Sequence, residues 1–154
     1  GLWWVYYILP SAPILHARRD RSFVWGYGHM IVFAAIVATG AGLHVAAYFI
    51  EHKAHIGPVA TLLTVAVPVS IYLLMIYALY AYLIGRFDLL HAWLLGGTVV
   101  VIAAAIVGAM AGIGMTWCLI ILMLAPVVTI VGYEVRGHRH QIEALATQSG
   151  PTVH

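Results

Sequence analysis

Residues Ser22–Ile50 read SFVWGYGHMIVFAAIVATGAGLHVAAYFI and contain no Lys, Arg, Asp or Glu. A helix needs about 20 mostly apolar residues to cross the hydrocarbon core of a bilayer. Three more runs of this kind follow, at about 58–84, 89–111 and 115–133. The sequence therefore predicts an all-α fold, a polytopic transmembrane helix bundle with four full spans in a single domain.

The two ends of the chain differ from these spans. Residues 1–9 form an apolar run of only about half the length that a span requires. They lack the basic start and the small-residue cleavage site of a signal peptide. We therefore expect residues 1–9 to be the end of a truncated span. Residues 134–154 are polar and finish in a Gly/Pro stretch, which predicts a tail outside the membrane.

The composition excludes most other classes of protein. Hydrophobic residues make up 64% of the 154 residues and charged residues 8%, against about half and about a quarter in soluble domains. Lys and Arg number 7 and Asp and Glu 5, an excess too small to indicate nucleic-acid binding. The single cysteine, Cys118, permits neither an intrachain disulfide nor a Cys-based metal site. The surroundings predicted for this chain are a lipid bilayer.

The positive charges are unevenly divided between the two sides of the predicted membrane. One side receives Lys53 alone. The other side receives Arg18, Arg19, Arg21, Arg86, Arg136 and Arg139. Because Lys and Arg are enriched in cytoplasmic loops, the Arg-rich side is predicted to be cytoplasmic, together with the C-terminus.

Small residues recur at every fourth position in two of the spans. Helices in lipid gain little from hydrophobic association and pack closely where side chains are small. The pattern therefore predicts two close helix–helix contacts. The residues concerned are Ala34, Ala38, Gly42 and Ala46 in the first span, and Ala104, Gly108 and Gly112 in the third.

Ionisable residues inside a span are costly and mark candidate functional sites. The spans hold no Lys, no Arg and no well-buried carboxylate, which excludes a retinal Schiff base. The histidines His29 and His91 fall about two turns and one turn from the cytoplasmic side, so the two side chains could approach each other across helices. The candidate polar seam comprises Arg21, Tyr27, His29, Tyr77 and His91.

Other chemistry is less well supported. A haem held between His29 and His91 is feasible in geometry, and His44 lies near Glu51, His52 and His55 at the opposite membrane face, where a metal site could form. A hydrogen-bonded histidine is the preferred interpretation of each, and we expect no metal and no cofactor. Because no nucleophile–base pair, phosphate loop or pair of catalytic carboxylates is recognisable, we do not expect an enzyme.

A more specific pattern surrounds the start of the first span. Residues 21–29 read RSFVWGYGH, and they are followed by FAAI at 33–36 and GAGL at 40–43, with LWWVYY upstream at 2–7. This pattern resembles the bacterial low-temperature-requirement protein A family. The resemblance implies a bacterial inner-membrane protein of about twice this length or more, with an N-terminal half before residue 1. It implies no settled activity, and His44 stands where family members are expected to vary.

Two classes of function remain open. We slightly favour a transport or permeation protein whose path follows the polar seam. The alternative is a non-catalytic accessory or scaffold subunit of a larger membrane complex. In either case the expected partners are other transmembrane helices, from an N-terminal half or from neighbouring subunits.

The first prediction concerns topology and uses cysteines introduced one at a time into a Cys118→Ala background. A membrane-impermeant maleimide added to intact cells should label Ala54→Cys. It should not label Arg19→Cys, Arg86→Cys or Arg139→Cys, because among these four positions only 54 is predicted to lie on the external side. Labelling at positions 19, 86 or 139 without labelling at 54 would reverse the predicted orientation.

Overall fold

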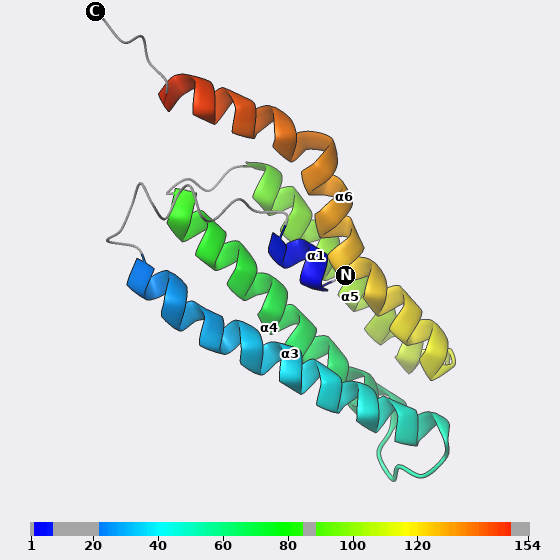
Figure 1. The fold of residues 1–154 in the computed structure, drawn as a ribbon. Coiled ribbons are helices and arrows are strands. Elements are labelled where there is room, and N and C mark those ends of the chain that lie inside the picture. Colours follow the sequence, from blue (N-terminus) through cyan, green and yellow to red (C-terminus); the bar gives the residue numbers. More distant parts are fainter. Residues whose placement is uncertain (1, 8–21, 85–88, 149–154) are drawn as a thin grey trace, which may run out of the picture.

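The computed structural model describes residues 2–7, 22–84 and 89–148, and the side chains of these residues except 3, 7, 83–84, 89–91 and 133–148. The described residues contain helices and no strand: α1 (Leu2–Tyr7), α3 (Ser22–Ile50), α4 (Pro58–Ile84), α5 (Leu89–Met110) and α6 (Met115–Gln148) (Figure 1). Four of these helices are long and apolar enough to cross a membrane, within 22–50, 58–82, 92–110 and 115–132. The predicted all-α fold with four long apolar helices is confirmed, and a six-residue helix, α1, precedes them.

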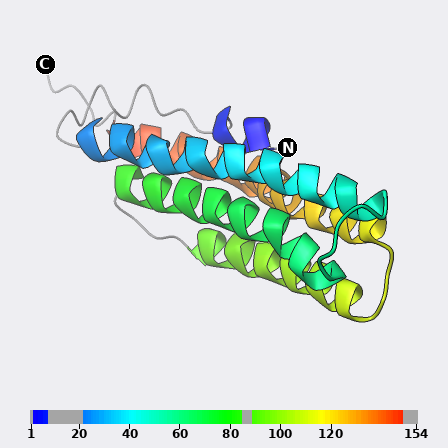
Figure 2. The ribbon, with the colours of Figure 1, turned by 90° about the horizontal axis from the view of Figure 1, so that it is seen from below.

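The four long helices alternate in direction. The connections at 51–57 and 111–114 lie at the same end of the bundle (Figure 2). Helix α3 packs chiefly on α4, and α5 on α6. Helix α4 also contacts α5 and α6, and 50% of its most apolar stretch is buried, against 28–33% in the other three spans. Helix α4 is therefore the centre of the bundle.

The buried face of α3 repeats at alternating intervals of three and four residues. Its members are Gly28, Val32, Ala35, Thr39, Gly42 and Ala46, together with His29. With 3.6 residues per turn, this alternation keeps the side chains on one side of the helix, whereas a strict interval of four drifts by about 40° per step. The predicted stripe therefore joins this face only at Gly42 and Ala46, and Ala34 and Ala38 are exposed. A contact of those two residues with a further helix stays a prediction.

The closest approach of α3 and α4 lies at Gly42. Pro68 has no N–H to donate to the carbonyl of Thr64, four residues earlier in α4. That carbonyl lies against Gly42, where an added Cβ would overlap it and would lie 3.0 Å from the Val65 nitrogen. The Thr64 hydroxyl has a single hydrogen, which it shares between the Thr61 carbonyl at 2.7 Å and the Gly42 carbonyl at 3.3 Å. Helix α3 thus covers the point where proline interrupts the hydrogen bonding of α4.

A glycine turn joins α5 to α6. Gly112 has a φ of 81°, which glycine adopts without steric cost. The Gly112 nitrogen donates to the Ala109 carbonyl at 3.3 Å, and the Ile113 nitrogen donates to the Gly108 carbonyl at 2.9 Å. This pair of bonds is a Schellman motif, which satisfies the last carbonyls of a helix. Gly112 therefore ends α5, while Gly108 is buried and Ala104 is exposed.

The last helix is longer than its apolar part. The membrane-crossing stretch ends at Gly132, close to the predicted end at 133, but the backbone remains helical to Gln148. Residues 133–148 contain no proline and include several good helix formers, so helix continues into part of the sequence interpreted as a polar tail. Figure 1 shows this C-terminal part turning away from the bundle.

The second prediction compares two glycines of α3. Gly42→Ala should destabilise the folded protein by about 1–3 kcal/mol, because the new methyl group meets the α4 backbone, which cannot move aside. Gly40→Ala should have an effect within about 1 kcal/mol, because nothing lies within 4 Å of its added Cβ. Unfolding in mixed detergent measures both. Equal stability of the two variants would contradict the close contact.

Candidate functional site

His29 is a buried histidine in the second turn of α3, with 9% of its surface exposed. Its Nδ1 lies 2.6 Å from the carbonyl oxygen of Trp25, and its Nε2 lies 2.9 Å from the hydroxyl of Tyr6. Because a carbonyl only accepts hydrogen bonds, Nδ1 carries the hydrogen. In the neutral ring, Nε2 then accepts from Tyr6, so both ring nitrogens are bonded.

Three aromatic rings surround the imidazole of His29. The ring centroids of Trp25, Tyr6 and Phe33 lie 4.9, 5.5 and 6.0 Å from the imidazole centroid. Trp25 and Phe33 precede and follow His29 by one turn of α3, whereas Tyr6 comes from α1. We call these four residues the histidine cluster. It brings together two segments separated by more than twenty residues.

Helix α1 is attached to α4 as well as to α3. The hydroxyl of Tyr72, a side chain with no exposed surface, donates to the carbonyl of Leu2 at 2.6 Å. Val5 is only 1% exposed. In Figure 1 the short α1 lies beside α4 and α6, and α1 also contacts α6. Hydrogen bonds at both ends and one buried valine therefore hold this six-residue helix against the bundle.

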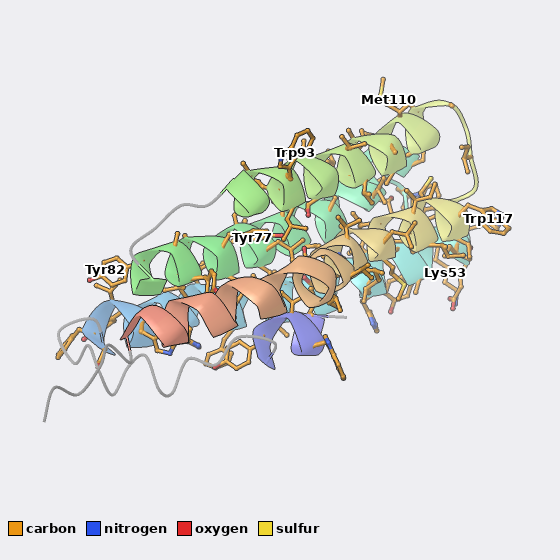
Figure 3. The ribbon with its side chains drawn as sticks, turned by 90° about the horizontal axis from the view of Figure 1, so that it is seen from above. Lys53, Tyr77, Tyr82, Trp93, Met110 and Trp117 are labelled. Carbon is orange, nitrogen blue, oxygen red and sulfur yellow. The ribbon has the colours of Figure 1, made fainter. Side chains whose placement is uncertain are left out.

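A second polar cluster joins α4, α5 and α6. The hydroxyl of Tyr77 lies 2.9 Å from that of Thr129 and is also hydrogen-bonded to Thr98. Thr98 donates in addition to the Leu94 carbonyl at 2.9 Å. All three hydroxyl-bearing residues are buried. Figure 3 shows Tyr77 inside the bundle, whereas Trp93, Met110 and Trp117 point away from it.

The candidate polar seam is distributed differently from the prediction. Tyr72 and Tyr77 are five residues apart, which turns their side chains about 140° from each other on α4. His29 and Tyr77 therefore belong to two separate clusters. Tyr27 is 65% exposed and stacks on Phe23 at 5.7 Å. Arg21 lies outside the described residues, as does the side chain of His91, so their part in a seam stays a prediction.

Sequence reasoning missed three partners of the predicted residues: Tyr6, which bonds to His29, and Thr98 and Thr129, which bond to Tyr77. Buried tyrosine and threonine hydroxyls require a hydrogen-bonding partner, and this rule was the one available signal. It indicates that a partner exists without indicating which one. The pairing depends on how α1 and α6 pack on α4, which is a property of the tertiary structure.

At the opposite membrane face the polar residues are mostly exposed. Lys53 and Glu51 form an exposed ion pair at 2.7 Å, and His44 packs on the edge of Tyr48 at 5.3 Å. In the described part of the chain, no three His, Cys, Asp or Glu side chains lie close enough together to hold a metal ion. Cys118 is buried, and its thiol lies 3.5 Å from the Ile113 carbonyl.

The helices and their apolar surfaces define a multi-pass α-helical membrane protein. Residues 1–126 match the family of the bacterial low temperature requirement A protein, and the chain belongs to this family. The match extends from α1 through α5 into α6, well beyond residues 2–43, which contain the stretches that carried the resemblance. Among curated proteins and solved structures, none shows significant similarity to this chain.

The third prediction concerns the Tyr77–Thr129 bond. A double-mutant cycle of Tyr77→Phe and Thr129→Val should give a coupling energy of about 0.6 kcal/mol, with about 1.7 kcal/mol as the upper bound for such bonds in membranes. Unfolding in mixed detergent supplies the four stabilities. Thr116→Val, an exposed threonine on α6, is the control and should show no coupling to Tyr77→Phe. The absence of coupling between Tyr77 and Thr129 would contradict the bond.

Proposed function

We propose that this chain is part of a bacterial inner-membrane protein that moves a small ion or polar solute, with the histidine cluster on its path. The observation that carries the proposal is the burial of His29 inside a membrane span. It is a buried, titratable side chain in a span that has no charged residue, and its two nitrogens are bonded to groups on α1 and α3. Ionisable groups inside a membrane are expensive and are associated with ion and solute pathways.

The polar groups between α3 and α4 support a path that extends beyond His29. Thr39 is buried on the α4-facing side of α3, ten residues and about 15 Å along the helix from His29. Thr64 and Thr61 lie at the Gly42 contact, near the end of α4 that is far from His29. Hydroxyl groups therefore occur at successive depths of the bilayer along one interface. In the closed packing of this structure they bond to backbone carbonyls, so movement along them requires α3 and α4 to separate.

The distribution of charge suggests which side the cluster faces. His29 lies seven residues after the start of α3, about 10 Å along the helix. This end of α3 adjoins the Arg-rich segments, which the positive-inside rule assigns to the cytoplasm. The histidine cluster would therefore form the cytoplasmic entrance of the path, and the exposed Lys53 loop would lie at its external end.

A second candidate function is an accessory or scaffold subunit of a larger membrane complex. The outer faces of α3 and α5 favour it, because they expose large apolar side chains over much of their length. Such faces suit lipid and also suit further transmembrane helices, and Ala34 and Ala38 lie on the outer surface of α3. Purification from a native membrane extract distinguishes the two functions, because only the scaffold is expected to co-purify in fixed stoichiometry with a complex that has an activity of its own.

The fourth prediction tests transport in proteoliposomes containing wild-type protein or His29→Gln. Gln keeps hydrogen-bonding capacity and cannot take up a proton, so the variant should fold and should lose the pH dependence of ion or solute flux between about pH 5.5 and 8. His44→Gln, at an exposed histidine, should retain it. Identical flux profiles for wild type and His29→Gln, or no flux from wild type, would contradict transport and favour the accessory subunit.

A further inference from the structure

We propose that α4 and α6 bend together at Pro68 and Pro126, and that this bending opens the bundle at the end that holds His29. The opposite end, which holds the connections at 51–57 and 111–114, stays closed. We call these two ends the His29 end and the connection end. The proposal goes beyond transport, because it concerns movement within the bundle and holds whether or not anything permeates.

The two prolines lie at the same depth of the bundle. Both α4 and α6 start at the connection end, with Pro68 ten residues after Pro58 and Pro126 eleven residues after Met115. At 1.5 Å per residue these positions are about 15 and about 17 Å along their helices, close to the middle of a hydrocarbon core of about 30 Å. Both prolines are buried, and α4 contacts α6. Two neighbouring helices that run in the same direction are thus interrupted at one level.

The backbone of each helix is weakened at this level. A proline inside a helix has no N–H to donate to the carbonyl four residues earlier, and helices kink most often at such positions. Close to Pro68, the Ser70 hydroxyl bonds to a carbonyl one turn earlier at 2.7 Å, and close to Pro126 the Thr129 hydroxyl lies 3.4 Å from the carbonyl one turn earlier. Hydroxyls that bond back to a helix carbonyl often bend helices. Bending of α4 and α6 is therefore least costly at the two prolines.

The contact between α3 and α4 is rigid at the connection end and deformable at the His29 end. A Cβ added at Gly42 would meet the α4 backbone at Thr64. A Cβ added at Gly28 would meet instead the ends of the Leu79 and Met75 side chains. Side-chain ends of this kind move by changing rotamer, and Met adapts most readily because it has three rotatable bonds. The α3–α4 interface can therefore separate beyond Pro68 while the Gly42 contact keeps it closed before Pro68.

The second polar cluster makes the two bending helices move as one unit. Tyr77 lies nine residues beyond Pro68 and Thr129 three residues beyond Pro126, and their hydroxyls are 2.9 Å apart. Tyr77 is also hydrogen-bonded to Thr98 of α5, a helix without proline. A bend in α4 therefore carries α6 with it, and α5 tilts as a whole about its turn to α6. Hinge motions of this kind need only a few residues that absorb the change in backbone angles.

A modest bend produces a measurable displacement. The end of α4 at Ile84 is sixteen residues beyond Pro68, which is about 24 Å of helix. A change of about 20° in the bend, the size above which helix kinks are called sharp, moves this end by about 8 Å. At the level of Leu79, which lies against Gly28, the displacement is about 6 Å. Such a bend separates α4 from α3 beside His29 and leaves the Gly42 contact intact.

The fifth prediction is tested by pulsed electron paramagnetic resonance of the full chain in bilayers, with pairs of spin-labelled cysteines in a Cys118→Ala background. Figure 2 shows α3 and α5 on either side of α4, so a label on each reports the width of the bundle. The pair Met30→Cys with Trp93→Cys reports the His29 end, and the pair Leu43→Cys with Val107→Cys reports the connection end, all four at exposed positions. In wild type, the distances of the first pair should spread over about 6 Å more than those of the second.

The double variant Pro68→Ala with Pro126→Ala restores both missing backbone donors, so it should narrow the distances at the His29 end to the width found at the connection end. The matched control is Pro58→Ala, which should change neither width, because a proline in the first turn of a helix replaces no intrahelical hydrogen bond. Unchanged distances at the connection end verify that each variant is folded.

Equal widths at the two ends in wild type would overturn the proposal on their own, whether or not the double variant folds. So would a folded double variant whose distances at the His29 end stay as broad as in wild type. None of these measurements involves flux, so the hinge and the transport function can fail separately.

Discussion

The contact between Gly42 and the carbonyl of Thr64 is the constraint on which the other features of this bundle depend. Within a bilayer a backbone carbonyl has no water to bond, so the one that Pro68 leaves without a helix partner must be covered by protein. Helix α3 covers it because Gly42 has no side chain in the way, and the Thr64 hydroxyl, which also bonds within α4, lies 3.3 Å from the Gly42 carbonyl. The close approach of α3 at Gly42 thus compensates for the interruption of α4 at Pro68.

This contact sets the register of α3 against α4, and the register places both polar clusters. The two helices are antiparallel, so with Gly42 beside Thr64, Gly28 lies against Leu79. Gly28 is the residue that precedes His29. His29 then meets α1, which Tyr72 holds from α4. On another face of the same helix, Tyr77 binds Thr129. Helix α4 therefore connects the histidine cluster to α5 and α6 without any charged residue inside the spans.

The sequence predicted the helices well and the contacts between them only in part. Helix lengths follow from the thickness of the bilayer, which is why the boundaries at Ser22, Ile50 and Pro58 agree with the structure. The stripe of small residues identified Gly42 and Ala46 on the buried face but extended to the exposed Ala34 and Ala38, because a period of four is not the period of a helix. The partnership of Tyr6 with His29 depends on the docking of a six-residue helix, which no local pattern encodes.

The most direct test of this account is a carbon–carbon contact measured by solid-state NMR in bilayers. With carbon-13 at glycine Cα and at threonine carbonyl carbons, a through-space signal should connect Gly42 to Thr64 and should be absent from the Gly42→Ala variant. Signals between the adjacent Gly97 and Thr98 serve as the internal reference. A spectrum with the reference signal and no Gly42–Thr64 contact would contradict the packing of α3 on α4, and with it the placement of both clusters.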